Sequence, residues 1–317
     1  MEMIMVKETL EKLVCLTRRV PKDNVSEEQI AAKLDQLRCE GYTTFSHLVG
    51  KPEFVKLASH IARAFEQEMA FTTPCLAQRR IEQVRDADLI EKNFLVSTEE
   101  LVSRGLTFDR DDIHSYEQVI EEFAPSTLKL PIPDLPQFLD LWLDHNVTKV
   151  IEAYMGFTPI LREAYIRRNF PCSYPVMNHK WHRDTNHRTH LLKAFIFFTD
   201  CDLETGAHHY IAGSVGDSRF RDKVYYDDAE IESGFPAADG KKISSVVPAG
   251  TIVLEDTRGL HKAGIPTRDY RDLGFAVFVP PSLPGFFKPL YRVNKSSYDS
   301  LQPSQRRFIP SNHIEKR

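Results

Sequence analysis

The sequence predicts a mainly β fold, an antiparallel β-sandwich or jelly roll buttressed by N-terminal helices. Before residue 156 the apolar residues recur mostly at helical spacing, whereas after it short β-rich runs alternate with clusters of Gly, Pro and Asp. Helices gathered in one half and strands in the other are typical of such layered folds. Hydrophobic residues make up 42% of the 317 residues and charged residues 27%, so one large domain with a sizeable core is feasible.

Amphipathic helices are predicted over 4–19, 26–39, 51–70 and 136–155. Ser26 and Gln29 form a capping-box pattern for the second helix, and Gly156 is a suitable C-cap for the last. A short strand is expected at 42–45. The stretch 71–135 shows no clear periodicity, and we interpret it as an insertion that packs beside the core.

The helical N-terminal segment, residues 1–156, is followed by a predicted jelly-roll core over about 157–285 and a polar tail over 286–317. Within the core, strands are expected at 159–169, 190–199, 207–211, 251–255 and 273–280. We expect all of this to form a single domain.

Composition argues against several classes of protein. A net charge of −4 and a pI near 6.3 disfavour a nucleic-acid partner held by bulk electrostatics. Five widely spaced cysteines without a CxxC motif suggest neither a zinc knuckle nor a disulfide framework, and favour a reduced, cytoplasmic protein. The sequence shows neither a signal-peptide pattern nor an apolar stretch of membrane-spanning length, so we expect no membrane partner.

The segment His182-Arg183-Asp184 is the strongest chemical signal. On a strand, side chains at i and i+2 share one face, so His182 and Asp184 would present an imidazole and a carboxylate together. His261, which follows a β-branched strand, can complete a two-His-one-carboxylate set. That set suits non-haem Fe(II) with positions open for a cosubstrate and O2.

Arg271 stands ten residues after His261, directly before a predicted strand. A guanidinium grips a carboxylate through two parallel hydrogen bonds, so Arg271 is a candidate anchor for the distal carboxylate of 2-oxoglutarate. Lys193 and Phe195 share one face of their strand. If Phe195 faces into the barrel then Lys193 does too, and a buried lysine needs a carboxylate partner.

Four blocks resemble the phytanoyl-CoA dioxygenase (PhyH-like) superfamily of Fe(II)/2-oxoglutarate-dependent oxygenases. They are WHRD (181–184), FIFFTDCDLETGAHHYIAGS (195–214), PAGTIVLED (248–256) and the His261…Arg271 pair. The resemblance covers about residues 158–280 well and 38–70 weakly. It implies a double-stranded β-helix in which His182, Asp184 and His261 ligate iron and Arg271 binds 2-oxoglutarate.

The resemblance also implies roles for neighbouring residues. Asn169, thirteen residues before the first ligand, matches a 2-oxoglutarate contact of ectoine-hydroxylase-like members, and Phe195 stands where some members place a Trp beside the cosubstrate. Because the family often separates its His and Arg by one residue more, Arg268 is a rival anchor. Asp184 is intact, whereas related halogenases replace this carboxylate, so halogenation is disfavoured. The turn ends in Ala212-Gly213-Ser214-Val215 instead of PGSH, a change expected to affect local packing more than the metal.

Other readings of the polar residues stay open. The run His179, His182, His187 and His190 invites a zinc site. His208 and His209 fit partly exposed strand positions better than ligands, and Trp181, opposite His182, fits the core. Lys180, Arg183, Arg188 and Lys193 can line a pocket for an anionic substrate, although a solvated face is the more common fate of such residues.

The function expected is an Fe(II)/2-oxoglutarate-dependent dioxygenase that oxidises, by default hydroxylates, a C–H bond of a small, anionic metabolite, releasing succinate and CO2. Desaturation and cyclisation use the same site. The cofactors would be Fe(II), 2-oxoglutarate and O2, with ascorbate stimulating. One alternative is a metal-binding jelly-roll protein that binds or senses without turnover. Another is a cupin-like metal-dependent hydrolase or isomerase, which makes no use of Arg271.

Overall fold

The computed structural model describes residues 28–67, 127–171, 177–184, 190–281 and 289–315. The helix expected over 4–19, Ser26 and most of the insertion over 71–135 lie outside these ranges. Within them, none of the helices combines the length and the apolar character that a membrane crossing requires.

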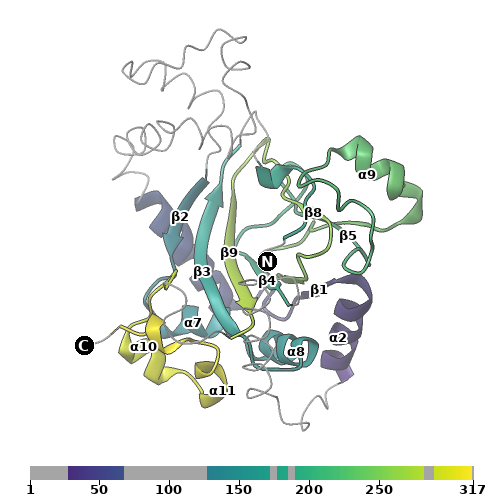
Figure 1. Cartoon of the computed structure of the whole chain (residues 1–317). Helices are drawn as coiled ribbons and strands as arrows, with labels where there is room; N and C mark the ends of the chain where they lie inside the picture. Colours follow the sequence, from purple (N-terminus) through teal and green to yellow (C-terminus); the bar gives the residue numbers. More distant parts are fainter. Residues whose placement is uncertain (1–27, 68–126, 172–176, 185–189, 282–288, 316–317) are drawn as a thin grey trace, which may run out of the picture.

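Two antiparallel sheets form the centre of the protein (Figure 1). The larger has the strand order β1-β7-β4-β9-β3-β2 and the smaller β6-β5-β8. In chain order, the strands are β1 (Tyr42–Phe45), β2 (Thr127–Pro131), β3 (Ile160–Asn169), β4 (Leu192–Phe197), β5 (His209–Ile211), β6 (Lys242–Ser244), β7 (Ile252–Glu255), β8 (His261–Lys262) and β9 (Arg271–Val279). Each strand expected from the sequence is present, with ends shifted by a few residues.

Strand β9 is buried along its whole length because both of its faces are covered. Leu273, Phe275 and Val277 pack on the inner face together with residues of the smaller sheet. The alternate residues Ala276 and Phe278 pack on the outer face against the helices. The larger sheet therefore separates two apolar clusters, and the inner cluster joins the two sheets.

The helices cover the outer face of the larger sheet (Figure 1). They are α2 (Glu28–Glu40), a helix over 52–67, α7 (Pro136–Trp142) and α8 (His145–Met155). The single helix expected over 136–155 is wrong, because Asp144 interrupts it. Its side chain accepts hydrogen bonds from the backbone N–H groups of Asn146 and Val147, the pattern of an N-cap. Gly156, with φ +77°, ends α8 as expected.

Residue 274 must be a glycine because Trp142 lies against it. A Cβ at Gly274 would stand 2.9 Å from the indole ring, and the indole Nε1 donates to the carbonyl oxygen of Phe275 at 3.0 Å. This contact fixes α7 to the middle of β9.

Several elements had no clear sequence pattern. Strand β2, which falls inside the expected insertion, pairs with β3 at the edge of the larger sheet. The helices α9 (Asp228–Gly234), α10 (Lys295–Ser300) and α11 (Pro303–Arg306) are short, so they show little periodicity. In the tail, α10 contacts α7, and Phe308 and Ile309 join the outer cluster.

Candidate metal centre

Backbone pairing brings together two segments that are far apart in the sequence. His182 and His261 exchange two hydrogen bonds, with N···O distances of 2.9 and 3.0 Å. The N–H of Asp184 donates to the carbonyl oxygen of Thr257 at 2.9 Å. As a result, ligand atoms of His182, Asp184 and His261 all lie within 4.8 Å of one another.

Both imidazoles are oriented by the chain that precedes them. Nδ1 of His182 lies 2.8 Å from the carbonyl oxygen of Lys180, and Nδ1 of His261 lies 3.0 Å from that of Gly259. A carbonyl only accepts, so we assign the ring proton to Nδ1, which leaves the lone pair of each Nε2 for a metal. Burial lowers the pKa of both histidines, so both stay neutral as ligands must.

Asp184 supplies the negative charge of the group. Burial alone would raise the pKa of its carboxyl, but the neighbouring Lys193, His261 and Thr257 together outweigh burial, so the net pKa is lowered. Nζ of Lys193 lies 2.5 Å from Oδ2 of Asp184, and Nε2 of His261 lies 3.7 Å from the same oxygen. Lys193 thus faces inward with a carboxylate partner, as the sequence required of a barrel-facing lysine. The register partner of Lys193 on β7 is Glu255.

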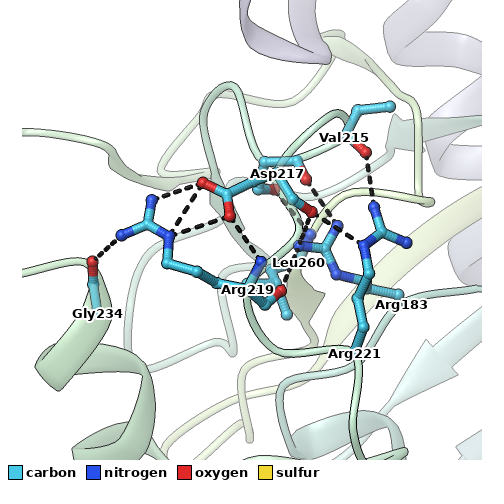
Figure 2. Close-up of polar contacts among 8 residues, drawn as sticks. Arg183, Val215, Asp217, Arg219, Arg221, Gly234 and Leu260 are labelled. Carbon is cyan, nitrogen blue, oxygen red and sulfur yellow. Dashed lines mark hydrogen bonds and ion pairs between the residues drawn. The ribbon is translucent and has the colours of Figure 1, made fainter.

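Arg183, between the two ligands of its strand, points to the opposite side and is buried. Its guanidinium makes five hydrogen bonds to backbone carbonyl oxygens, at 2.6–3.4 Å, those of Ser214, Asp217, Arg219, Phe220 and Arg258. Figure 2 shows this guanidinium beside the turn at Asp217, which Arg219 and Arg221 also bind. Arg183 is therefore a structural clamp and does not belong to a substrate pocket.

Ser214 ties the same loop to the other ligand segment. Its Oγ accepts from the N–H of Leu260, next to His261, at 2.8 Å, while its carbonyl oxygen accepts from Arg183. Ser214 is fully buried. One residue of the Ala212–Ser214 turn thus braces both segments that carry candidate ligands.

Arg271 begins β9 and is 2% exposed, yet its Nε and Nη1 have no hydrogen-bond partner among the described residues. Burial lowers its pKa to about 10, so the group stays charged at neutral pH. A buried guanidinium with unpaired N–H groups is costly unless an anion binds it. Asn169 is its register partner on β3 and is also buried. Arg268, in contrast, is exposed and pairs with Asp202 and Glu204 on the surface.

Phe195 packs inside the inner cluster, as its shared face with Lys193 predicts. Its ring lies 5.0 Å from that of His208 and 5.4 Å from that of Phe275. The side chain therefore contributes to an apolar wall beside the polar groups of the interior.

His208 is buried, whereas the sequence suggested a partly exposed strand position. It lies two residues before the buried Tyr210 and so faces the interior, a signal that was present in the sequence. Its Nε2 lies 2.8 Å from Oε2 of the fully buried Glu255. Burial raises the pKa of Glu255 and, with Arg271, lowers that of His208. The ring of His208 stacks 5.5 Å from that of His261.

The donors of the triad fit a divalent transition metal. Two neutral imidazole nitrogens and one ionised carboxylate are the facial set of non-haem Fe(II) sites. Among the described residues this is the one such group of three, and neither His179 nor His190 belongs to it. His187 and Arg188 lie outside the described residues. Trp181 is buried, as its position opposite His182 suggested.

No protein-family model and no curated protein matches the sequence. A search of solved structures finds proteins similar to this chain at low sequence identity. The non-haem alpha-ketoglutarate-dependent carbocyclase SnoK of nogalamycin biosynthesis is 18% identical, with a TM-score of 0.44 over 80% of this chain and 84% of its own. EctD from S. alaskensis with bound Fe is 15% identical (TM-score 0.46; 82% and 79% covered). HygX from Streptomyces hygroscopicus with nickel and 2-oxoglutarate is 17% identical (TM-score 0.44; 82% and 89% covered).

Replacing Arg183, the structural clamp, should weaken metal binding, although its side chain points away from the triad. We expect Arg183→Lys to lower the free energy of unfolding by about 2 kcal/mol or more, since most of five hydrogen bonds are lost. Metal affinity should fall by roughly 10- to 100-fold, the usual cost of removing a group that orients a ligand. Calorimetric titration with Fe(II) under anaerobic conditions, with urea unfolding, measures both. The control is Arg221→Gln, an exposed residue of the same loop, and equal losses in the two variants would refute the clamp.

Acid should destabilise the metal-free protein. Burial holds the pKa of His261 well below its ordinary value and that of His313 at about 4, so the unfolded chain binds protons that the folded protein rejects. Their contribution to stability is therefore lost progressively as pH falls below about 6.5. The lowered pKa of His208 and the raised pKa of Glu255 change the free energy of unfolding with pH in opposite directions. Urea unfolding at a series of pH values measures the trend, and a flat or rising free energy on acidification would contradict it.

Proposed function

We propose that the protein is an Fe(II)- and 2-oxoglutarate-dependent dioxygenase that hydroxylates a C–H bond of a small metabolite and releases succinate and CO2. The observation that carries this proposal is the triad of two neutral imidazoles and one carboxylate, together with a buried guanidinium that lacks an anion. The two antiparallel sheets that share an inner core agree with the jelly roll that such a site requires.

In this proposal His182, Asp184 and His261 hold Fe(II), and Arg271 binds the distal carboxylate of 2-oxoglutarate, with Asn169 beside it. Bound iron would supply the activation of O2, coupled to oxidative decarboxylation of 2-oxoglutarate, as in other sites with three open positions. The protein itself orients the metal ligands and keeps water away from the site. The carbonyls of Lys180 and Gly259 aim the two imidazoles, and the inner cluster excludes water.

The proposal assigns different tasks to two arginines three residues apart. Arg271 is buried with free N–H groups, whereas Arg268 is saturated by surface carboxylates. This difference favours Arg271 as the anchor and disfavours a cupin-like hydrolase or isomerase, in which a buried guanidinium would have no use.

Turnover provides the first test. Protein supplied with Fe(II), ascorbate and 2-oxoglutarate should release succinate slowly, and faster once a suitable small molecule is added. Loss of a direct ligand should cost at least as much as loss of an orienting group, so we expect Asp184→Ala to lower the rate by about 100-fold or more. Full turnover by this variant would remove the triad assignment. Metal binding without any consumption of 2-oxoglutarate would favour a binding or sensing protein.

The second test compares the two arginines. Arg271→Gln should raise the dissociation constant of 2-oxoglutarate by about tenfold or more, because a charge-assisted, bidentate contact is lost. Arg268→Gln, which removes the same charge from the surface, should change it by less than about twofold. Calorimetry on the metal-loaded proteins gives both values, and Fe(II) affinity should be the same in the two variants. Similar losses of 2-oxoglutarate affinity would exclude Arg271 as the anchor.

A further inference from the structure

A second inward-facing guanidinium lies near Arg271. Arg167 belongs to β3, two residues before Asn169, so it faces the same side of the sheet as Asn169 and Arg271. Its guanidinium carbon lies 5.4 Å from the centre of the Phe275 ring, in the inner cluster. Its Nε is buried and has no hydrogen-bond partner in the part of the chain that the structure describes.

Nothing in the described residues of the chain neutralises this charge. Neither Arg167 nor Arg271 forms an ion pair with a described carboxylate, and the two guanidinium groups repel one another. Two cations without a carboxylate partner in one interior are costly. The Phe275 ring offsets part of that cost for Arg167, and a bound anion would stabilise each guanidinium further. One molecule of 2-oxoglutarate has one distal carboxylate and can satisfy one of them.

Burial distinguishes the two arginines. Arg271 is almost fully buried, which suits a cosubstrate that is enclosed throughout turnover, whereas Arg167 is half-buried, with its Nε shielded from solvent. The Phe275 ring beneath Arg167 stacks on Tyr165, with ring centres 4.8 Å apart, and meets Phe195 edge-on. The surface next to Arg167 is therefore aromatic.

Arg167 also lies within a small molecule's length of the metal ligands. Nζ of Lys193 is 5.5 Å from the centre of the same Phe275 ring and 2.5 Å from Asp184. Because both distances are measured to the same ring centre, the guanidinium carbon of Arg167 and Nζ of Lys193 are at most about 11 Å apart. A compound of one ring with a charged substituent can bridge that distance.

We propose that Arg167 binds an anionic group of the substrate, a carboxylate or phosphate, and holds the rest of the molecule against Phe275 toward the triad. The proposal rests on the proposed function and narrows the substrate class to small organic anions. Arg167 is a substrate-binding residue here, separate from the anchor of 2-oxoglutarate.

The test uses three probes that share one ring and differ in charge, namely benzoate, phenyl phosphate and neutral benzamide. Each is titrated calorimetrically into the full-length protein loaded anaerobically with Fe(II) and 2-oxoglutarate. We expect at least one anion to bind about tenfold or more tightly than benzamide, and Arg167→Gln to abolish the difference. Arg167→Lys, which keeps the charge but loses the planar fork, should retain some of it.

Two controls separate this site from its surroundings. Arg38→Gln removes one charge from the exposed face of α2 and should leave the binding of all three probes unchanged. The dissociation constant of 2-oxoglutarate, followed by its visible absorption on Fe(II), should change by less than about twofold in Arg167→Gln.

Three outcomes would overturn the proposal. Equal or absent binding of the three probes to the wild-type complex would show that no anion site exists. Anion binding unaffected by Arg167→Gln would place the site elsewhere, and a tenfold loss of 2-oxoglutarate affinity in that variant would make Arg167 a cosubstrate anchor. Failure of the wild-type protein to bind 2-oxoglutarate at all is a separate result, seen before any probe is added, and it would contradict the proposed function itself.

Discussion

The antiparallel pairing of His182–Asp184 with Thr257–His261 is the constraint on which the candidate centre depends. Three backbone hydrogen bonds align two short segments, and every later feature of the triad follows from that register. A slip of one residue would turn both ligands of the first segment to the far side, because neighbouring side chains on a strand point in opposite directions. The fold holds this register from behind, where Arg183 collects five carbonyl oxygens and Ser214 links the loop to Leu260. The polar clamp on one face thus sets the geometry of the polar site on the other.

The interior beside the triad combines charges that differ in how they are compensated. Asp184 is paired with Lys193, and the Glu255–His208 pair is neutral as a whole wherever its proton lies. Arg271 and Arg167 have no such partner among the described residues. Since the aromatic wall of Phe195, Phe275 and Tyr165 cannot replace the water that these cations lose, the two guanidinium groups are the positions at which we propose that anions bind. Comparing the paired charges with the two arginines therefore indicates candidate binding positions that the shape of the interior alone would not show.

Much of this arrangement could be predicted from the sequence, and the exceptions have physical reasons. The strands after residue 156 are short runs rich in apolar and β-branched residues, bounded by Gly, Pro and Asp clusters, so their positions could be predicted. The spacing of His182 and Asp184 on one strand face predicted the first candidate pair. The face that Lys193 shares with Phe195 predicted that Lys193 would have a carboxylate partner. The helix break at Asp144 was missed because apolar periodicity continues through it, while a single capping side chain decides the boundary. Arg167 and Glu255 gave no sequence signal of function, since a lone charge in a strand becomes informative only once its facing partners are known.

The ion pair between Lys193 and Asp184 has a consequence for how the protein is made. A carboxylate in so apolar a setting would oppose folding if it were left without a cation. Lys193 provides that cation from within the chain, at 2.5 Å, so the interior can close before any iron arrives. If the protein holds iron as proposed, its folding would thereby be independent of the supply of that metal. Loading would then be an exchange in which the ammonium group of Lys193 gives up Asp184 to the metal.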